Sequence, residues 1–159
     1  MLIRAMRYLG AIALLGVGAD HLQQYLGQDY QVIPTIGPLF LLNAIGSGVV
    51  GILLVLPIER TLRRRSGNAT TALLATAGVA IAVGSLAALF ISETGSLFGF
   101  SETGYRTAIV LAIASEAATI LLLTPVAAIS LRRAARPQTA SRDRSTPDRS
   151  PRQLGLTSR

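Results

Sequence analysis

Four long hydrophobic stretches alternate with short polar segments along the 159 residues of the chain. A helix needs about 20 apolar residues to cross the hydrocarbon layer of a membrane, and each stretch reaches that length. The pattern predicts an all-α fold, a four-transmembrane-helix bundle within residues 1–133. The expected helices cover residues 4–26, 36–56, 70–91 and 105–131.

The first hydrophobic stretch has a second interpretation. Residues 17–19, Val-Gly-Ala, resemble the small-residue cleavage site of a secretory signal peptide. Apolar residues nevertheless continue at helical spacing beyond that site, at Leu22, Tyr25 and Leu26. We therefore expect a retained helix, with cleavage as the alternative.

Small residues inside transmembrane helices let neighbouring helices approach closely. Two sets of small residues are expected to make such contacts. They are Gly10, Gly16 and Gly18 in the first stretch, and Ala80, Gly84 and Ala88 in the third.

The connecting segments contain turn residues and few apolar ones. Asp29 is the only charge between residues 27 and 35, and Pro38 suits the first turn of the second helix. Pro57 is expected to end that helix, and a sharp turn over residues 58–68 carries four arginines.

Two further segments have unusual compositions. Residues 92–104 contain Ser-Glu-Thr-Gly twice, around Leu-Phe-Gly-Phe, and we expect these aromatic residues to dip into the membrane interface. Residues 134–159 are rich in Arg, Ser, Pro and Thr and cannot bury a core. We predict that this segment is a disordered, basic cytoplasmic tail.

The arginines predict an orientation. Fourteen of the fifteen lie near the N-terminus, in the 58–68 turn, or at and beyond the end of the fourth stretch, and only Arg106 lies elsewhere. The other two loops carry Asp29, Glu93 and Glu102. Because cytoplasmic loops are enriched in basic residues, both termini are expected in the cytoplasm. All basic residues are Arg and Ala is abundant, which favours a bacterial plasma-membrane protein.

Charge and residue content argue against several functions. The net charge of +7 is spread over helix ends and the tail, without a basic stripe bearing aromatics, so anionic lipid of the bilayer rather than nucleic acid is the expected partner. Cysteine is absent, and one histidine cannot supply a usual zinc or bis-histidine haem site. Phosphate-binding glycine loops, GxSxG and HExxH are also missing. We expect no metal, no cofactor and no enzymatic activity.

Polar side chains occur inside the hydrophobic stretches at similar depth. His21, Asn43, Ser85 and Glu116 belong to four different helices and lie roughly 8 to 16 Å below the outer end. An ionisable residue there costs several kcal/mol unless it is paired or faces water. We expect His21 and Glu116 to pair, with Asn43 completing their hydrogen bonds. Asp20 would contribute from nearer the surface.

Helical spacing places further polar groups next to this layer. Asp20 and Gln24 share one helix face, and His21 and Tyr25 share the adjacent one. The candidate ligand or proton site therefore consists of His21, Asn43 and Glu116, with Asp20 and Tyr25 beside them. A histidine near carboxyl groups can exchange protons near neutral pH.

The segment from His21 to Gly46 reads HLQQYLGQDYQVIPTIGPLFLLNAIG. It resembles a group of small uncharacterised four-helix membrane proteins of actinobacteria, with the patterns HLxxY, YxxIPTIG and LFLLN. LFGFSETG near the third connection fits the same group, and the layout is remotely similar to DoxX-type proteins. The resemblance implies an integral membrane protein and draws attention to Pro34 and Gly37. It implies no particular activity.

Three functions are compatible with the sequence. The first is a polar intramembrane site near the outer face that handles protons or a small polar solute. Four helices are few for a transport path, so a homo-oligomer or a partner membrane subunit is expected. The second is an accessory or scaffold subunit whose polar residues only fix helix packing. The third is a quinone- or redox-linked membrane component.

Overall fold

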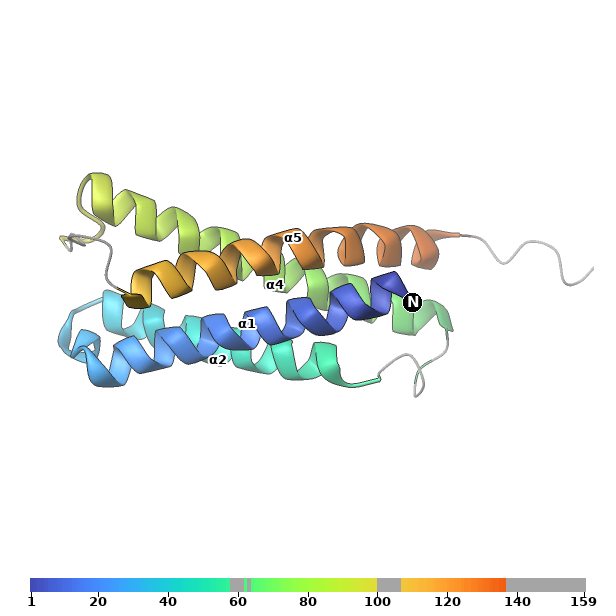
Figure 1. Cartoon of the computed structure of the whole chain (residues 1–159), viewed down its shortest axis with the longest axis horizontal. Helices are drawn as coiled ribbons and strands as arrows, with labels where there is room; N and C mark the ends of the chain where they lie inside the picture. Colours follow the sequence, from blue (N-terminus) through green and yellow to red (C-terminus); the bar gives the residue numbers. More distant parts are fainter. Residues whose placement is uncertain (58–61, 63, 100–106, 137–159) are drawn as a thin grey trace, which may run out of the picture.

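The computed structural model of the protein describes residues 1–57, 62, 64–99 and 107–136. Within these residues four α-helices pack as a bundle, and a single 3-10 turn follows the first helix (Figure 1). The elements are α1 (Leu2–Gly27), η1 (Tyr30–Val32), α2 (Ile36–Val55), α4 (Arg64–Thr94) and α5 (Thr107–Ala135).

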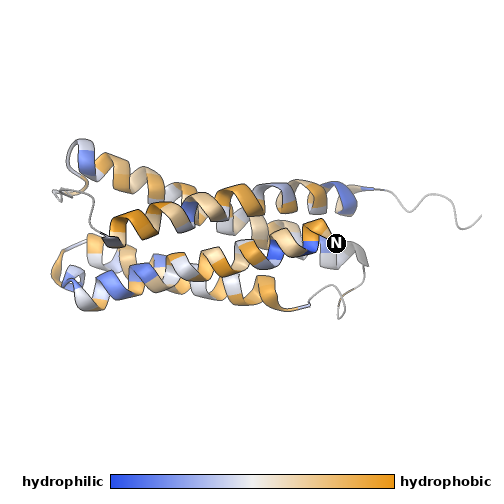
Figure 2. Cartoon of the chain, in the orientation of Figure 1, coloured by the Kyte–Doolittle hydropathy of each residue, from blue (hydrophilic) through white to orange (hydrophobic). Residues whose placement is uncertain are grey.

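All four helices are long and apolar enough to span a membrane. Figure 2 shows hydrophobic residues along the length of each helix. Large apolar side chains also point outward, since Leu42 is 69% exposed, Leu73 70% and Leu121 74%. Such a surface is unfavourable in water but not in hydrocarbon. The expected four-helix membrane bundle is confirmed at this level.

Helix boundaries differ from the sequence expectation, most at the two ends of α4 and at the end of α5. α4 begins at Arg64, so the turn expected over residues 58–68 is wrong for its last five residues. The Thr71 hydroxyl donates to the Gly67 carbonyl at 2.9 Å in this extra turn. The helix extends past its apolar residues because backbone hydrogen bonds within a helix need no surrounding hydrocarbon. α5 likewise extends to Ala135.

Some expectations fall on residues outside the described ranges. They include the arginines of residues 58–61 and 63, the loop residues 100–106, and the tail from residue 137 onward. Phe98, at the described edge of the third connection, is 67% exposed. α1 runs through residues 17–19 without a break.

Glycines bring α1 close to its neighbours. A Cβ atom on Gly10 would lie 2.5 Å from Leu123 Cδ2 of α5, and one on Gly18 would lie 3.1 Å from the Ala44 carbonyl oxygen of α2. The expected close contacts are therefore confirmed at these two positions. At Gly16 the nearest atom, Cβ of Ser115, is at an ordinary 3.8 Å.

An apolar cluster joins all four helices in the half of the bundle near the N-terminus. Its members are buried and pack against one another, which holds the helices together without polar groups. They are Ala11, Leu14, Leu54, Ala75, Leu123 and Val126.

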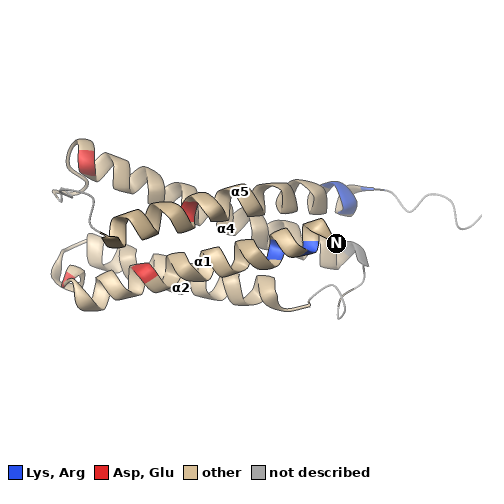
Figure 3. Ribbon diagram, viewed as in Figure 1, with Lys and Arg blue, Asp and Glu red and all other residues tan. Residues whose placement is uncertain are grey.

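Basic residues gather at one end of the bundle. Figure 3 shows them at the start of α1 and at the end of α5, at the end marked N, whereas acidic residues lie elsewhere along the bundle. The residues at the basic end include Arg4, Arg7, Arg132 and Arg133. Arg7 is buried, and its guanidinium lies 4.8 Å from the centre of the Tyr8 ring.

The connection between α1 and α2 is strained at Thr35. This residue has φ 68° and ψ −48°, and the Ile36 N–H donates to the Pro34 carbonyl at 2.8 Å. The geometry is a γ-turn of the rare, strained kind. Because threonine is β-branched, a positive φ is unfavourable there, so surrounding contacts must hold the turn in place.

Gly37 provides one of these contacts. A Cβ atom there would lie 2.7 Å from the Tyr30 carbonyl oxygen and 3.0 Å from that of Gln31. The Tyr30 side chain is buried, and its ring meets the Phe40 ring edge-on with 4.8 Å between centroids. Glycine at position 37 therefore lets η1 pack directly on the first turns of α2.

We predict that Gly37→Ala destabilises the bundle by about 1–3 kcal/mol, because the new methyl group meets backbone atoms that cannot rotate away. The measurement is unfolding by heat or denaturing detergent in micelles. Gly48→Ala is the matched control, because nothing lies within 4 Å of a Cβ atom at Gly48. Equal stability of the two variants would contradict the close packing of η1 on α2.

Candidate functional site

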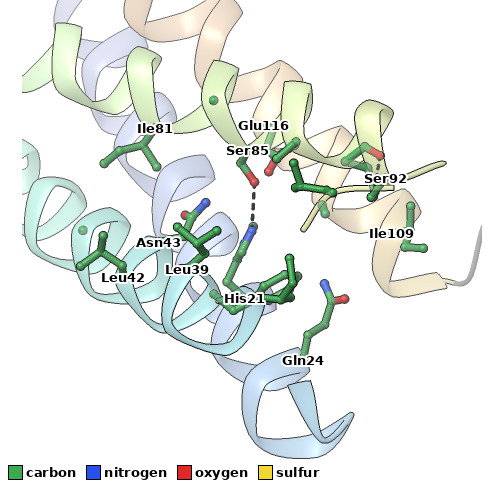
Figure 4. A pocket seen from close by; sticks show the side chains of 18 of the residues that line it. His21, Gln24, Leu39, Leu42, Asn43, Ile81, Ser85, Ser92, Ile109 and Glu116 are labelled. Carbon is green, nitrogen blue, oxygen red and sulfur yellow. Dashed lines mark hydrogen bonds between the residues drawn. The ribbon is translucent and has the colours of Figure 1, made fainter. Parts of the chain in front are cut away.

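A hydrogen bond between two helices crosses the bundle at Ser85 of α4. The His21 Nε2 atom of α1 lies 3.0 Å from Ser85 Oγ (Figure 4). The Glu116 side chain of α5 lies beside Ser85 in the same view and lines the same cavity. Polar side chains from three helices therefore lie together at this point.

The second imidazole nitrogen fixes the tautomer of His21. Its Nδ1 atom lies 2.9 Å from the Val17 carbonyl oxygen, one turn earlier in α1. A carbonyl can only accept, so Nδ1 carries a hydrogen. In the neutral imidazole Nε2 is then unprotonated and accepts the hydrogen of the Ser85 hydroxyl.

Glu116 is buried and only partly satisfied. It is 1% exposed, and its Oε2 atom has no hydrogen-bond partner among the described residues. A buried carboxyl oxygen without a partner is unfavourable, because it has lost water and gained nothing. It therefore remains available to a further hydrogen-bonding group.

These groups lie at the base of a cavity of about 540 Å³ between the helices. Figure 4 shows His21, Asn43, Ser85 and Glu116 around it, with Gln24 and Ser92 further along. The remaining lining side chains are apolar, apart from two glycines. The site combines a largely apolar wall with a few polar groups, as ligand-binding cavities in proteins commonly do.

The candidate residues fall into two groups. His21, Asn43 and Glu116 line the cavity, whereas Asp20 and Tyr25 do not. Asp20 is connected to the lining indirectly, because its Oδ2 atom accepts a 2.7 Å hydrogen bond from Gln24 Nε2. Tyr25 is half-buried and lies on the same helix without reaching the cavity.

The hydrogen-bonding scheme expected from the sequence is corrected in two respects. His21 hydrogen-bonds Ser85 and the Val17 carbonyl rather than Glu116. Asn43 does not complete their hydrogen bonds, because its Oδ1 atom accepts from Ser47 at 3.0 Å. Ser47 lies one turn away on the same helix face and is therefore the nearer partner.

The small residues of α4 also have a different role from the one expected. Ala80, Gly84 and Ala88 line the cavity instead of meeting a neighbouring helix. Nothing lies within 4 Å of a Cβ atom placed on Gly84. α2 packs more loosely on α4 than α5 does, which leaves this face of α4 open.

Sequence reasoning missed part of the site. Ser85 was noted only for its depth, and Gln24 only for its helix face, yet Gln24 is 3% exposed and lines the cavity. The Phe40 ring lies with its centroid 5.0 Å from the His21 imidazole. Depth already placed Ser85 in the polar layer, whereas nothing in the residue pattern distinguished Phe40 from an ordinary lipid-facing side chain.

The fold and the buried polar residues define a small multi-pass membrane protein. Comparison with protein families, with curated proteins and with solved structures gives no match. In the described part of the chain, no three His, Cys, Asp or Glu side chains group as a metal site would require. The resemblance at residues 21–46 stays a prediction.

We predict that His21 is protonated at Nδ1 and hydrogen-bonded at Nε2 when the imidazole is neutral. The chain has a single histidine, so ¹⁵N labelling of histidine gives one pair of nitrogen signals. Ser85→Ala should shift the Nε2 signal, because its hydrogen-bond partner is removed. Ser92→Ala should leave it unchanged, because Ser92 donates to the Leu89 carbonyl. Identical spectra for both variants would contradict the hydrogen bond between His21 and Ser85.

Proposed function

We propose that the protein is a small, non-enzymatic membrane protein with a polar intramembrane site that handles protons or binds a small polar group. The site consists of His21, Ser85 and Glu116, with Asn43 beside them. The observation that supports it is the hydrogen bond from His21 to Ser85 beside the buried Glu116, all three in the lining of one cavity. Asp20 acts through Gln24, and Tyr25 is not assigned to the site.

In this proposal a hydrogen-bonded chain runs from His21 through Ser85 to Glu116, and it suits proton transfer because two proton arrangements satisfy it. In the first, neutral His21 accepts from Ser85, and the protonated carboxyl group of Glu116 donates to Ser85. In the second, imidazolium donates to Ser85, and Ser85 donates to the carboxylate. Shifting both hydrogens along the chain converts one arrangement into the other without breaking its connectivity. The Ser85 hydroxyl would thus couple the protonation of His21 in α1 to that of Glu116 in α5.

A role in packing alone explains less of the geometry. The apolar cluster around Leu14 and Leu123 already joins the four helices. The polar groups line an open cavity instead of a filled interface, and Glu116 Oε2 has no partner in the described structure. Polar side chains kept only to hold helices together would be expected to satisfy one another.

We place both termini in the cytoplasm of a bacterial cell, with the site near the outer face of the plasma membrane. Arginines at the ends of α1 and α5 share one end of the bundle, which supports this orientation (Figure 3). His21 lies six residues before the end of α1 at Gly27, or about 9 Å along the helix. A second copy or a partner membrane subunit would complete any longer path.

Variants of Glu116 separate proton handling from packing. We expect Glu116→Gln to fold as wild type, because the amide can still hydrogen-bond Ser85. Glu116→Leu should lose about 1–3 kcal/mol, because the polar partner disappears. In liposomes loaded with a pH-sensitive dye, wild type should speed pH equilibration, and both variants should fall to the rate of protein-free liposomes.

Two outcomes would oppose this function. If wild type equilibrates pH no faster than protein-free liposomes and the histidine signals do not change with pH, the site does not handle protons. If Glu116→Gln and Glu116→Leu are both as stable and active as wild type, Glu116 has no functional role. In either case the scaffold function becomes the better explanation.

The orientation can be tested directly because the chain has no cysteine. We expect Gln31→Cys, in η1, to react with a membrane-impermeant maleimide on intact cells. Ala135→Cys, at the end of α5, should react only after the cells are opened. Both positions are exposed in the structure, so lack of reaction reports the membrane and not burial. The reverse labelling pattern would place the termini outside.

A further inference from the structure

The cavity has an opening between α2 and α4. Leu39 and Leu42 of α2 lie at its edge and are 43% and 69% exposed. On the α4 side Gly84 is also exposed. In a bundle that spans a membrane, such outward-facing positions meet hydrocarbon, so this opening faces the bilayer.

The lining excludes strongly charged headgroups. Among the described residues that line the cavity there is no arginine, and the only ionisable groups are His21 and Glu116. A phosphate group would find no fixed counter-charge there, and burying an unpaired charge is costly. Hydroxyl, imidazole, amide and carboxyl groups instead suit a neutral headgroup with hydrogen-bond donors or acceptors.

The base of the cavity offers a position for such a headgroup. Glu116 is fully buried, and its Oε2 atom has no partner among the described residues. The neighbouring Ser85 carries the chain onward to His21. A headgroup that hydrogen-bonds Oε2 would complete the bonding of the carboxyl group, beside the aromatic wall formed by Phe40.

We infer that the cavity binds a neutral amphiphile taken laterally from the bilayer, with its apolar body between α2 and α4 and its hydroxyl headgroup at Ser85 and Glu116. This inference rests on the proposed intramembrane site and names the class of its ligand. A cavity of about 540 Å³ is of the size that holds small ligands. An aromatic quinol and a long-chain alcohol share this chemistry.

Gly84 allows the cavity to be filled without disturbing the bundle. A side chain there would enter open space, because nothing lies within 4 Å of its Cβ position. Gly48 of α2 is equally open but does not line the cavity. Gly84→Leu and Gly48→Leu are therefore a matched pair that adds the same apolar volume inside and outside the proposed binding region.

The test is photolabelling of the full-length protein in phosphatidylcholine liposomes. Three probes are compared: a diazirine-bearing hexadecanol, the reduced quinol form of an azido-benzoquinone with a decyl chain, and a diazirine-bearing phosphatidylcholine. Adducts are counted by intact-protein mass. We expect a neutral probe to label wild type and Gly48→Leu equally, and Gly84→Leu about tenfold less. Preference between the two neutral probes identifies an aliphatic or an aromatic source.

The inference is overturned if both neutral probes label wild type and Gly84→Leu equally. It is also overturned if the phosphatidylcholine probe labels wild type as strongly as a neutral probe does and loses this labelling in Gly84→Leu. The histidine spectra and the pH equilibration of wild type need no added ligand. If those results hold while labelling is independent of Gly84, only the binding of an amphiphile is refuted. If they fail while labelling depends on Gly84, the proton function alone is refuted.

Discussion

A hydroxyl group inside a membrane must find its hydrogen-bond partners within the protein, because hydrocarbon supplies none. Ser85 finds such a partner on α1, at His21. This hydrogen bond fixes which faces of α1 and α4 turn toward one another at that depth. The buried carboxyl group of Glu116 on α5 lies in the lining of the same cavity.

The bundle is built differently in its two halves. Near the N-terminus Gly78 of α4 lies against Leu14 and Leu123, so apolar side chains fill the space between helices. Toward Thr94, α4 diverges from α2, as Figure 1 shows. The cavity lies where the helices have separated, and the packed half supplies the stability that an open polar half does not.

The sequence predicts the helices and the polar layer but not the hydrogen bonds within that layer. Hydrophobic length predicts the spans, and the rise per residue predicts the depth of His21 and Glu116. The direction of a side chain around its helix depends on packing that depth does not encode. Asn43 therefore bonds within its own helix, and Ala80 faces a cavity although small residues usually mark helix contacts. The predicted helix ends differ from the observed ones for a similar reason, since α4 extends beyond its apolar residues.

The strained connection explains how the aromatic wall reaches the polar chain. A threonine at positive φ costs of the order of 1–3 kcal/mol, so Thr35 keeps this conformation only because neighbours enforce it. The close approach at Gly37 and the buried Tyr30 ring supply that enforcement, and the same ring holds Phe40 beside His21. An unstrained connection would begin α2 in another direction and move Phe40 away from the imidazole. The strained turn at Thr35 and the position of Phe40 beside His21 therefore both depend on how η1 packs on α2.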